Sequence, residues 1–185
     1  AHIKENETIT ENNYLELGAA SGIVSLFLAR WLKQNNINHS ITCVEPNIDN
    51  IQFIEKTALS NNLKINILPF ALGNETKWTN FADEKHRGLV GDVALETSSN
   101  SKIIQKPMIT IDLLKIFCPK PDFCYVDTFL NEDFIITGLL RDYPDVDSYL
   151  IEFDYGPSKL IQKLLQENNY SLKQRKGINY LYSKN

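Results

Sequence analysis

The stretch YLELGAASG at Tyr14–Gly22 decides the fold of this 185-residue chain. A short apolar run that contains Glu16 leads into two glycines, Gly18 and Gly22, and a helical pattern of apolar residues starts at Ile23. This pattern is typical of a strand, a tight turn and the start of a helix. The first backbone N–H groups of a helix have no partner within the helix, so a ligand can bind at such a junction.

The spacing of the turn is ExGxxxG, which differs from the GxGxxG of dinucleotide-binding proteins. Glycine spacing sets how closely a turn approaches a pyrophosphate, so we expect this turn to hold a nucleoside without phosphates and disfavour a dehydrogenase. Glycine-rich turns occur in many folds, and an ordinary tight turn is the alternative at this point.

Strands and helices alternate after the turn. The apolar spacing predicts a helix from Ile23, a strand at Ile41–Val44, a helix at Ile48–Asn61 and a strand at Ile65–Leu68. Elements that alternate in this way form a parallel sheet with right-handed crossovers. Ligands of such sheets bind at the carboxyl ends of the strands.

Glu45 ends the second predicted strand, about 20 residues beyond the glycine turn. An acid at this place can accept hydrogen bonds from both hydroxyls of a ribose. A solvated carboxylate at a strand end is the alternative, and the preceding turn favours the ribose contact.

The glycine turn resembles motif I of class I S-adenosylmethionine-dependent methyltransferases. EPN at Glu45–Asn47 and NNLKINILPFALGN at Asn61–Asn74 resemble the FkbM family within that superfamily. The resemblance runs from Tyr14 to the C-terminus and is weaker in the second half. It implies S-adenosylmethionine as cofactor, with these contact residues: Glu16, Gly18, Ala19, Ala20, Ser21, Gly22, Glu45, Pro46, Asn47, Phe70 and Ala71.

The fourth predicted strand, Phe123–Val126, ends at Asp127, where the family commonly reads IDVEG. Phe129 and Leu130 replace the family Glu and Gly. The fifth predicted strand is Tyr149–Phe153, and strand alternation is expected to place Glu152 and Asp154 on one face.

The C-terminal part predicts a helix at Pro157–Asn168 and a hairpin of Tyr170–Arg175 with Asn179–Ser183. The resemblance implies that the hairpin completes a seven-stranded, mostly parallel sheet with an antiparallel C-terminal hairpin and helices on both faces. We expect a polar lead-in at residues 1–13 and a methyltransferase domain at residues 14–185. Because class I methyltransferases usually carry helices before the first strand, other domains of a longer chain are expected partners.

Trp78 and Phe81 alternate with polar residues and predict a short edge strand. The region from Ala82 to Lys102 has no clean period, which is typical of a binding loop, a lid or a disordered insertion. His86 and Arg87 lie in it and are candidate substrate contacts, with a solvated surface role as the alternative.

The leading hypothesis is methyl transfer to a hydroxyl of a small molecule, such as a sugar or glycan. Asp127 is the first candidate to orient or deprotonate the acceptor, followed by Glu152 and Asp154. A variant adds Mg²⁺ held by these three acids, with solvated acids or helix caps as the alternative. The competing hypothesis is a catalytically degenerate binding or scaffold domain, suggested by the replaced strand-end motif.

Composition limits the classes of binding partner that we expect. The net charge is -4 and the pI is about 5.4, so nothing electrostatic favours a nucleic acid or an anionic membrane. Cys43, Cys118 and Cys124 form no CxxC pair and are expected to be reduced structural thiols. The longest apolar runs fall short of the roughly 20 residues that span a bilayer, so we expect a cytoplasmic protein.

Overall fold

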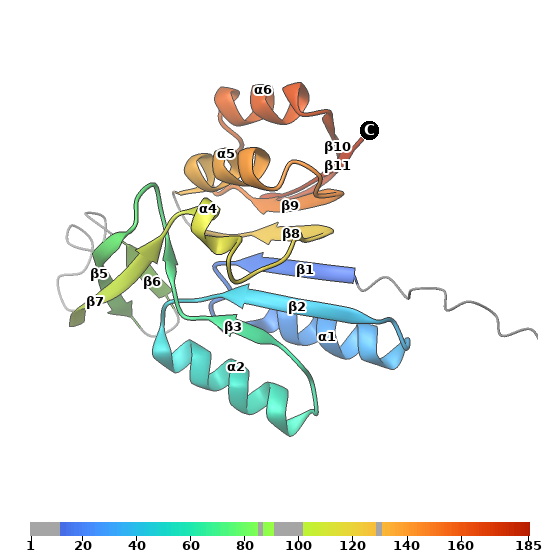
Figure 1. Ribbon diagram of the computed structural model, residues 1–185. Coiled ribbons are helices and arrows are strands. Elements are labelled where there is room, and N and C mark those ends of the chain that lie inside the picture. Colours follow the sequence, from blue (N-terminus) through green and yellow to red (C-terminus); the bar gives the residue numbers. More distant parts are fainter. Residues whose placement is uncertain (1–11, 85–86, 91–101, 129–130) are drawn as a thin grey trace, which may run out of the picture.

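The computed structural model describes residues 12–84, 87–90, 102–128 and 131–185. Its larger sheet has seven strands in the order β10-β11-β9-β8-β1-β2-β3 (Figure 1). The bounds of these strands are β1 Asn12–Leu17, β2 His39–Val44, β3 Asn66–Leu68, β8 Phe123–Val126, β9 Ser148–Glu152, β10 Tyr170–Lys176 and β11 Asn179–Lys184. The strands from β3 to β9 are parallel, and β10 and β11 form the antiparallel hairpin that the sequence predicts.

Helices pack on both faces of this sheet, as expected. The face that carries Leu15 and Leu17 shares a buried cluster with α4, α5 and α6, and the opposite face, with Ile41 and Cys43, packs on α1 and α2. The helix bounds are α1 Ile23–Gln34, α2 Ile48–Ser60, α4 Ile111–Leu114, α5 Glu132–Asp142 and α6 Lys159–Glu167. None of the described helices combines the length and hydropathy needed to cross a membrane.

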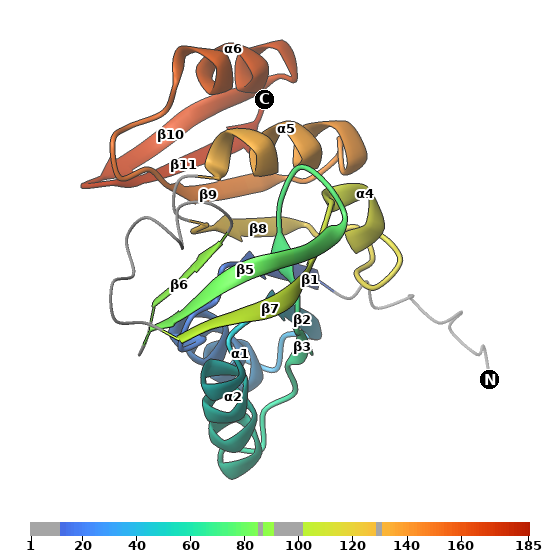
Figure 2. The same ribbon diagram turned by 90° about the vertical axis from the view of Figure 1, so that its left-hand side faces the viewer.

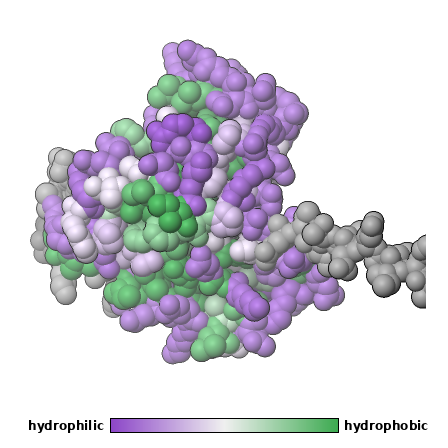
Figure 3. Space-filling model, viewed as in Figure 1, coloured by the Kyte–Doolittle hydropathy of each residue, from purple (hydrophilic) through white to green (hydrophobic). Residues whose placement is uncertain are grey.

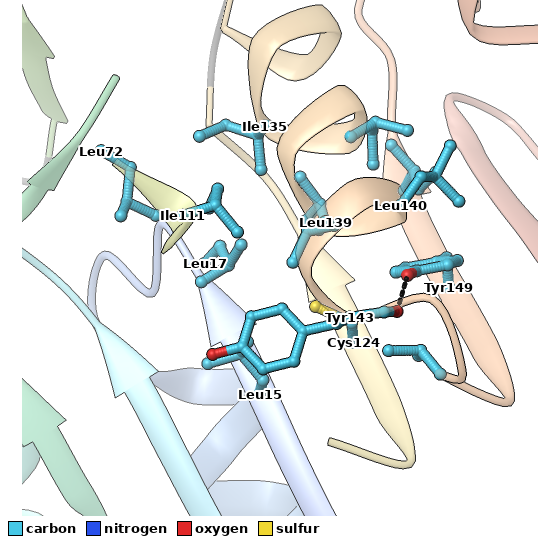
Figure 4. Close-up of a cluster of buried hydrophobic side chains, with 14 of the residues drawn as sticks. Leu15, Leu17, Leu72, Ile111, Cys124, Ile135, Leu139, Leu140, Tyr143 and Tyr149 are labelled. Carbon is cyan, nitrogen blue, oxygen red and sulfur yellow. Dashed lines mark hydrogen bonds between the residues drawn. The ribbon is translucent and has the colours of Figure 1, made fainter. Parts of the chain in front are cut away.

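The main core lies between the sheet and α5. Figure 4 shows Leu139 and Leu140 of α5 on the side of the strand residues Leu17 and Tyr149, with Ile135 one turn earlier on the same helix. The hydroxyl of Tyr149 donates to the carbonyl of Tyr143 at 3.4 Å, which gives this buried phenol a partner. The three cysteines are buried free thiols, in agreement with the prediction.

A second sheet, which the sequence analysis did not predict, has the order β4-β7-β5-β6. Its strands are β4 Ala71–Leu72, β5 Lys77–Glu84, β6 Arg87–Val90 and β7 Lys102–Ile109. The arrowheads of β1, β2 and β8 point to the side of the molecule where this small sheet lies (Figures 1 and 2). The small sheet therefore stands beside the edge where ligands of parallel sheets bind.

Three predicted elements need correction. The strand of Trp78 and Phe81 is β5, which is eight residues long and lies between β7 and β6, so it is not an edge strand. Part of the region predicted to be irregular pairs with it, because Arg87 to Val90 form β6. Helix α6 starts at Lys159 with Ser158 as its N-cap, so Pro157 lies before the helix.

The surface near α4 is apolar. The exposed side chains of Ile116 and Phe117 follow this helix, and Figure 3 shows hydrophobic surface around the position that α4 occupies in Figure 1. The ring of Phe117 packs 5.4 Å from that of Phe70, where the chain leaves the large sheet for the small one.

Candidate functional site

The glycine turn after β1 is built against the end of β8. Gly18 has a φ of 81°, and a Cβ atom at this position would lie 1.8 Å from the carbonyl oxygen of Asp127. The N–H of Asp127 in turn donates to the carbonyl of Leu17 at 2.9 Å. Only glycine can adopt this φ without strain and also leave room for the neighbouring backbone.

Glu16 is hydrogen-bonded to the first turn of α1. Its Oε2 accepts hydrogen bonds from the N–H of Ser25, at 3.0 Å, and from the hydroxyl of the same residue. Gly22, the N-cap of α1, has no side chain, so Glu16 satisfies an N–H of the first turn that a side-chain cap would otherwise take. Burial raises the pKa of Glu16 to about 7, opposed by the Ser25 hydrogen bonds and assisted by the charges of Asp127 and Glu45.

Glu45 is buried, which excludes the solvated strand-end alternative. Its Oε2 accepts from the N–H of Ala20 at 2.7 Å, and its Oε1 accepts from the N–H of Asn47 at 2.7 Å and from Nδ2 of Asn50 at 3.3 Å. Burial raises the pKa of Glu45, whereas these hydrogen bonds and the charge of Lys106 lower it. The carboxylate thus ties the glycine turn to the start of α2, and ribose contacts remain a prediction for its other lone pairs.

The rest of the predicted cofactor segment surrounds Glu45. The N–H groups of Gly18 and Ala19 both donate to the carbonyl of Val44, and Ala19 is buried. Asn47 is the N-cap of α2, with its side chain accepting from Asp49 and Asn50. Pro46 and Ser21 are half-buried in the same two turns.

Phe70 and Ala71 lie where the chain leaves β3. The N–H of Glu45 donates to the carbonyl of Leu68, which lies two residues before Phe70. The backbone of this segment is therefore close to Glu45. The Phe70 ring packs against Phe117, however, which gives it a structural partner. Contact of Phe70 and Ala71 with the cofactor stays a prediction.

The candidate acids at the ends of β8 and β9 are only partly brought together. Val126 pairs with Ile151, so Asp127 and Glu152 follow at the same level of adjacent parallel strands. Oε2 of Glu152 accepts from the hydroxyl of Tyr125 at 3.5 Å and from Nδ2 of Asn179 at 3.3 Å. Strand β9 ends at Glu152, so the predicted alternation does not reach Asp154, which is exposed in a turn.

Among the residues that the structure describes, no group of three His, Cys, Asp or Glu side chains could hold a metal ion. The variant in which Asp127, Glu152 and Asp154 together hold Mg²⁺ is therefore wrong, because Asp154 lies in a turn beyond the end of β9. The alternative of solvated acids fits Asp154, but not Glu152, which is half-buried and hydrogen-bonded.

Of the two predicted substrate contacts, Arg87 belongs to the small sheet. The backbone of Arg87 pairs with Glu84 at the start of β6. His86 lies outside the described residues, as do Phe129 and Leu130 of the replaced strand-end motif. Neither the substrate role nor the effect of the replacement is tested.

The sequence analysis missed Tyr125, Asn179 and Lys106. Tyr125 stands between the fully buried Cys124 and Val126 in β8, and strand alternation alone would have placed it on the face of Glu16. Asn179 and Lys106 reach the site through pairing of distant strands, which no local pattern reports.

Solved structures share the fold of this chain. The methyltransferase FkbM from Methylobacillus flagellatus superposes with a TM-score of 0.62 at 14% identity, covering 94% of this chain and 43% of that chain. A candidate RNA methyltransferase from Pyrococcus horikoshii gives a TM-score of 0.52 at 12% identity, covering 95% and 74%. The chain has the methyltransferase fold. It spans less than half the length of the solved FkbM protein.

At these identities the likeness shows the methyltransferase fold and not the reaction or the substrate. No protein-family model matches the sequence, and no curated protein matches it. The assignment to a Rossmann-like methyltransferase fold is confirmed, whereas membership of the FkbM family stays a prediction.

Proposed function

We propose that this protein is an S-adenosylmethionine-dependent O-methyltransferase that acts on a hydroxyl of a small molecule, with a sugar or glycan as the first candidate. One observation carries the proposal. The Gly18 turn and Asp127 lie against each other between β1 and β8, where the strand order of the parallel sheet reverses. Ligands of open α/β sheets bind outside the carboxyl ends of the strands at this switch point.

The chemistry of the turn fits a sulfonium nucleoside. Three acids, Glu16, Glu45 and Asp127, lie near the turn, and the charges of Asp127 and Glu45 help to raise the pKa of Glu16. Carboxylates at this place repel the phosphates of a dinucleotide and suit a ligand with a positive charge. Lys106 offsets part of this negative charge beside Glu45.

The protein's own contribution to such a reaction is alignment. Methyl transfer from a sulfonium is a single displacement, so holding donor and acceptor in line supplies most of the rate. Glu45 fixes the turn that would carry the ribose, and Asp127, at the end of β8, orients the acceptor hydroxyl. An alcohol acceptor also needs a general base to take its proton, a role that a carboxylate can fill.

Calorimetric titration with S-adenosylhomocysteine tests the donor site, with NAD as the comparison ligand. We expect S-adenosylhomocysteine to bind and NAD to give no heat of binding. The reverse pattern would overturn the proposal. Turnover is then measured by formation of S-adenosylhomocysteine from S-adenosylmethionine with a panel of methyl glycosides.

Binding without turnover across that panel would favour the binding or scaffold domain instead. Phe129→Glu combined with Leu130→Gly restores the pattern of the FkbM family and provides the follow-up. Activity gained by this double variant would identify the replaced motif as the cause of the missing turnover.

A further inference from the structure

A row of polar side chains crosses the large sheet at the level of the site. Glu16 in β1 pairs in register with Tyr125 in β8, and Glu152 at the end of β9 pairs with Asn179 in β11. The Tyr125 hydroxyl and Asn179 Nδ2 both donate to one oxygen of Glu152, which joins β8, β9 and β11 through a single carboxylate.

This row occupies the face of the sheet opposite the main core. Val126, Ile151 and Tyr182 belong to the cluster packed on the other side, next to α5 and α6. Side chains alternate along a strand, so Tyr125 and Glu152, each adjacent to one of these buried residues, point to the face of Glu16. The phenol is nearly buried, with 9% of its surface exposed, and its hydroxyl ends at the Glu152 carboxylate.

We propose that Glu152 takes the proton of the acceptor hydroxyl and that Tyr125 and Asn179 are positioning residues that hold its carboxylate for this step. The proposal rests on the proposed function and names residues of the same site. Two donors on Oε2 fix the rotation of the carboxylate and direct Oε1 away from them.

The Tyr125 phenol is a hydrogen-bond donor at neutral pH. Burial, followed by the charges of Asp127, Glu152 and Glu16, raises the pKa of the Tyr125 phenol. The phenol therefore stays protonated at neutral pH and donates to Glu152. Hydrogen bonds between catalytic groups are often long before substrate binds and shorten in the complex, which fits the 3.5 Å distance.

The step balances with S-adenosylmethionine as the second substrate. The acceptor oxygen forms a bond to the methyl carbon, the bond from that carbon to sulfur breaks, and sulfur keeps the electron pair. The proton of the acceptor hydroxyl passes to Glu152, which later releases it to solvent.

Tyr125→Phe tests the positioning role because it keeps the ring and deletes the hydroxyl. With S-adenosylmethionine and the best methyl glycoside of the panel, we expect kcat to fall about 10- to 100-fold. The KM for the glycoside and the affinity for S-adenosylhomocysteine should stay within about twofold, because Glu152 and not the ligand contacts the phenol. Tyr182→Phe is the matched control, since it removes a phenol from the opposite face of the sheet and should leave kcat unchanged.

Combining Tyr125→Phe with Glu152→Gln shows whether the phenol acts through Glu152. Glu152→Gln alone should lower kcat about 100- to 10,000-fold, and adding Tyr125→Phe should cause no further loss. Losses that multiply would show that Tyr125 acts by itself and would overturn the proposal. Lost affinity for S-adenosylhomocysteine in Tyr125→Phe would overturn it too, because the phenol would then serve the donor site.

Thermal unfolding of the wild-type protein, the two single variants Tyr125→Phe and Glu152→Gln, and the double variant gives a readout that does not depend on activity. The shifts of the melting temperature should be non-additive, since Tyr125→Phe removes the hydrogen bond and Glu152→Gln weakens the same bond by replacing a charged acceptor with a neutral amide oxygen. If the wild-type protein binds no S-adenosylhomocysteine, the proposed function fails and the proton-transfer role of Glu152 fails with it. If the protein binds S-adenosylhomocysteine but the shifts add, only the positioning proposal fails.

Discussion

Glu16 is a buried acid whose charge state changes near neutral pH. Its pKa is about 7 in the folded protein, against 4.5 for the ordinary side chain, so between these values the folded state holds a proton that the unfolded state has lost. The contribution of Glu16 to the free energy of unfolding is therefore full below about pH 4.5 and is lost as the pH rises through 7.

Glu16→Gln should remove this dependence. The amide oxygen can still accept from Ser25, and an uncharged side chain suffers no cost of burying a charge. We expect the variant to be more stable than the wild-type protein at pH 8 by about 1 to 3 kcal/mol and nearly equal to it at pH 4.5. Urea unfolding at both pH values measures the difference, and equal stability at pH 8 would refute it.

Gly18 is the residue at which the turn after β1 contacts the end of β8. Gly18→Ala should lower the free energy of unfolding by about 2 kcal/mol or more, because a methyl group would collide with the Asp127 carbonyl and the φ of 81° is unfavourable for alanine. Affinity for S-adenosylhomocysteine should fall with it. Both are measured, by urea unfolding and by calorimetry.

Gly177→Ala separates the two causes. Gly177 also has a positive φ, of 62°, but a Cβ atom there meets nothing within 4 Å. This control should cost only the backbone term, about 1 to 2 kcal/mol, and should leave ligand affinity unchanged. Equal effects of the two substitutions would mean that the contact with Asp127 does not matter.

At the scale of single elements, α2 links helix capping to the site. Asn47 caps α2 with its side chain and donates its N–H to Glu45. Asn47→Ala should lower stability by about 1 kcal/mol and should also weaken S-adenosylhomocysteine binding, because the turn that holds Glu45 loosens.

Ser158→Ala removes the N-cap of α6 and serves as the control. Its hydroxyl accepts from the N–H of Ile161 at 3.2 Å, in a helix that does not form the glycine turn. The loss of stability should be similar to that of Asn47→Ala, and ligand affinity should not change. A Ser158→Ala protein with weakened binding would show that stability alone governs affinity.

The elements differ in how far the sequence could predict them. Strand β8 has the bounds expected, Phe123–Val126, because an uninterrupted apolar run marks a strand that is buried on both faces. The small sheet could not be predicted, since residues of β5 pair with residues of β7 that lie 19 to 31 positions later in the chain, and neither strand contains a signal for its partner.

The site divides in the same way. Local spacing placed Gly18, Glu16 and Glu45 around one turn because they flank positions that a strand and a helix define, and their contact with a cofactor stays a prediction. The Tyr125 contact depends on the register between β8 and β9, which is set by packing of whole elements. Asp154 was misplaced because the strand ends two residues earlier than its alternation suggests.

At the scale of the whole molecule, the two tryptophans report on different parts. Trp31 lies in α1, and Trp78 lies in the small sheet. Leu139 of α5 is fully buried against the large sheet and is far from both tryptophans in sequence. Leu139→Ala should lower the free energy of unfolding by about 2 to 5 kcal/mol, because the lost contacts leave a cavity in the main core.

If the two sheets unfold as one unit, the unfolding transitions reported by the two tryptophans in Leu139→Ala should have the same midpoint, and this midpoint should be lower than in the wild-type protein. Trp31→Phe isolates the signal of Trp78, and Trp78→Phe isolates that of Trp31. A Trp78 midpoint that does not move with Leu139→Ala would show that the small sheet unfolds independently.

The contact between Gly18 and Asp127 also has a consequence for synthesis of the chain. Strand β1 can pair with β2 soon after it leaves the ribosome, but its other neighbour, β8, follows only about 100 residues later. At typical rates of about 5 to 20 residues per second, one edge of the central strand stays open for roughly 5 to 20 seconds. An open edge is a template for pairing with other chains. The strand that carries the turn thus exposes an unpaired edge while the following residues are being synthesised.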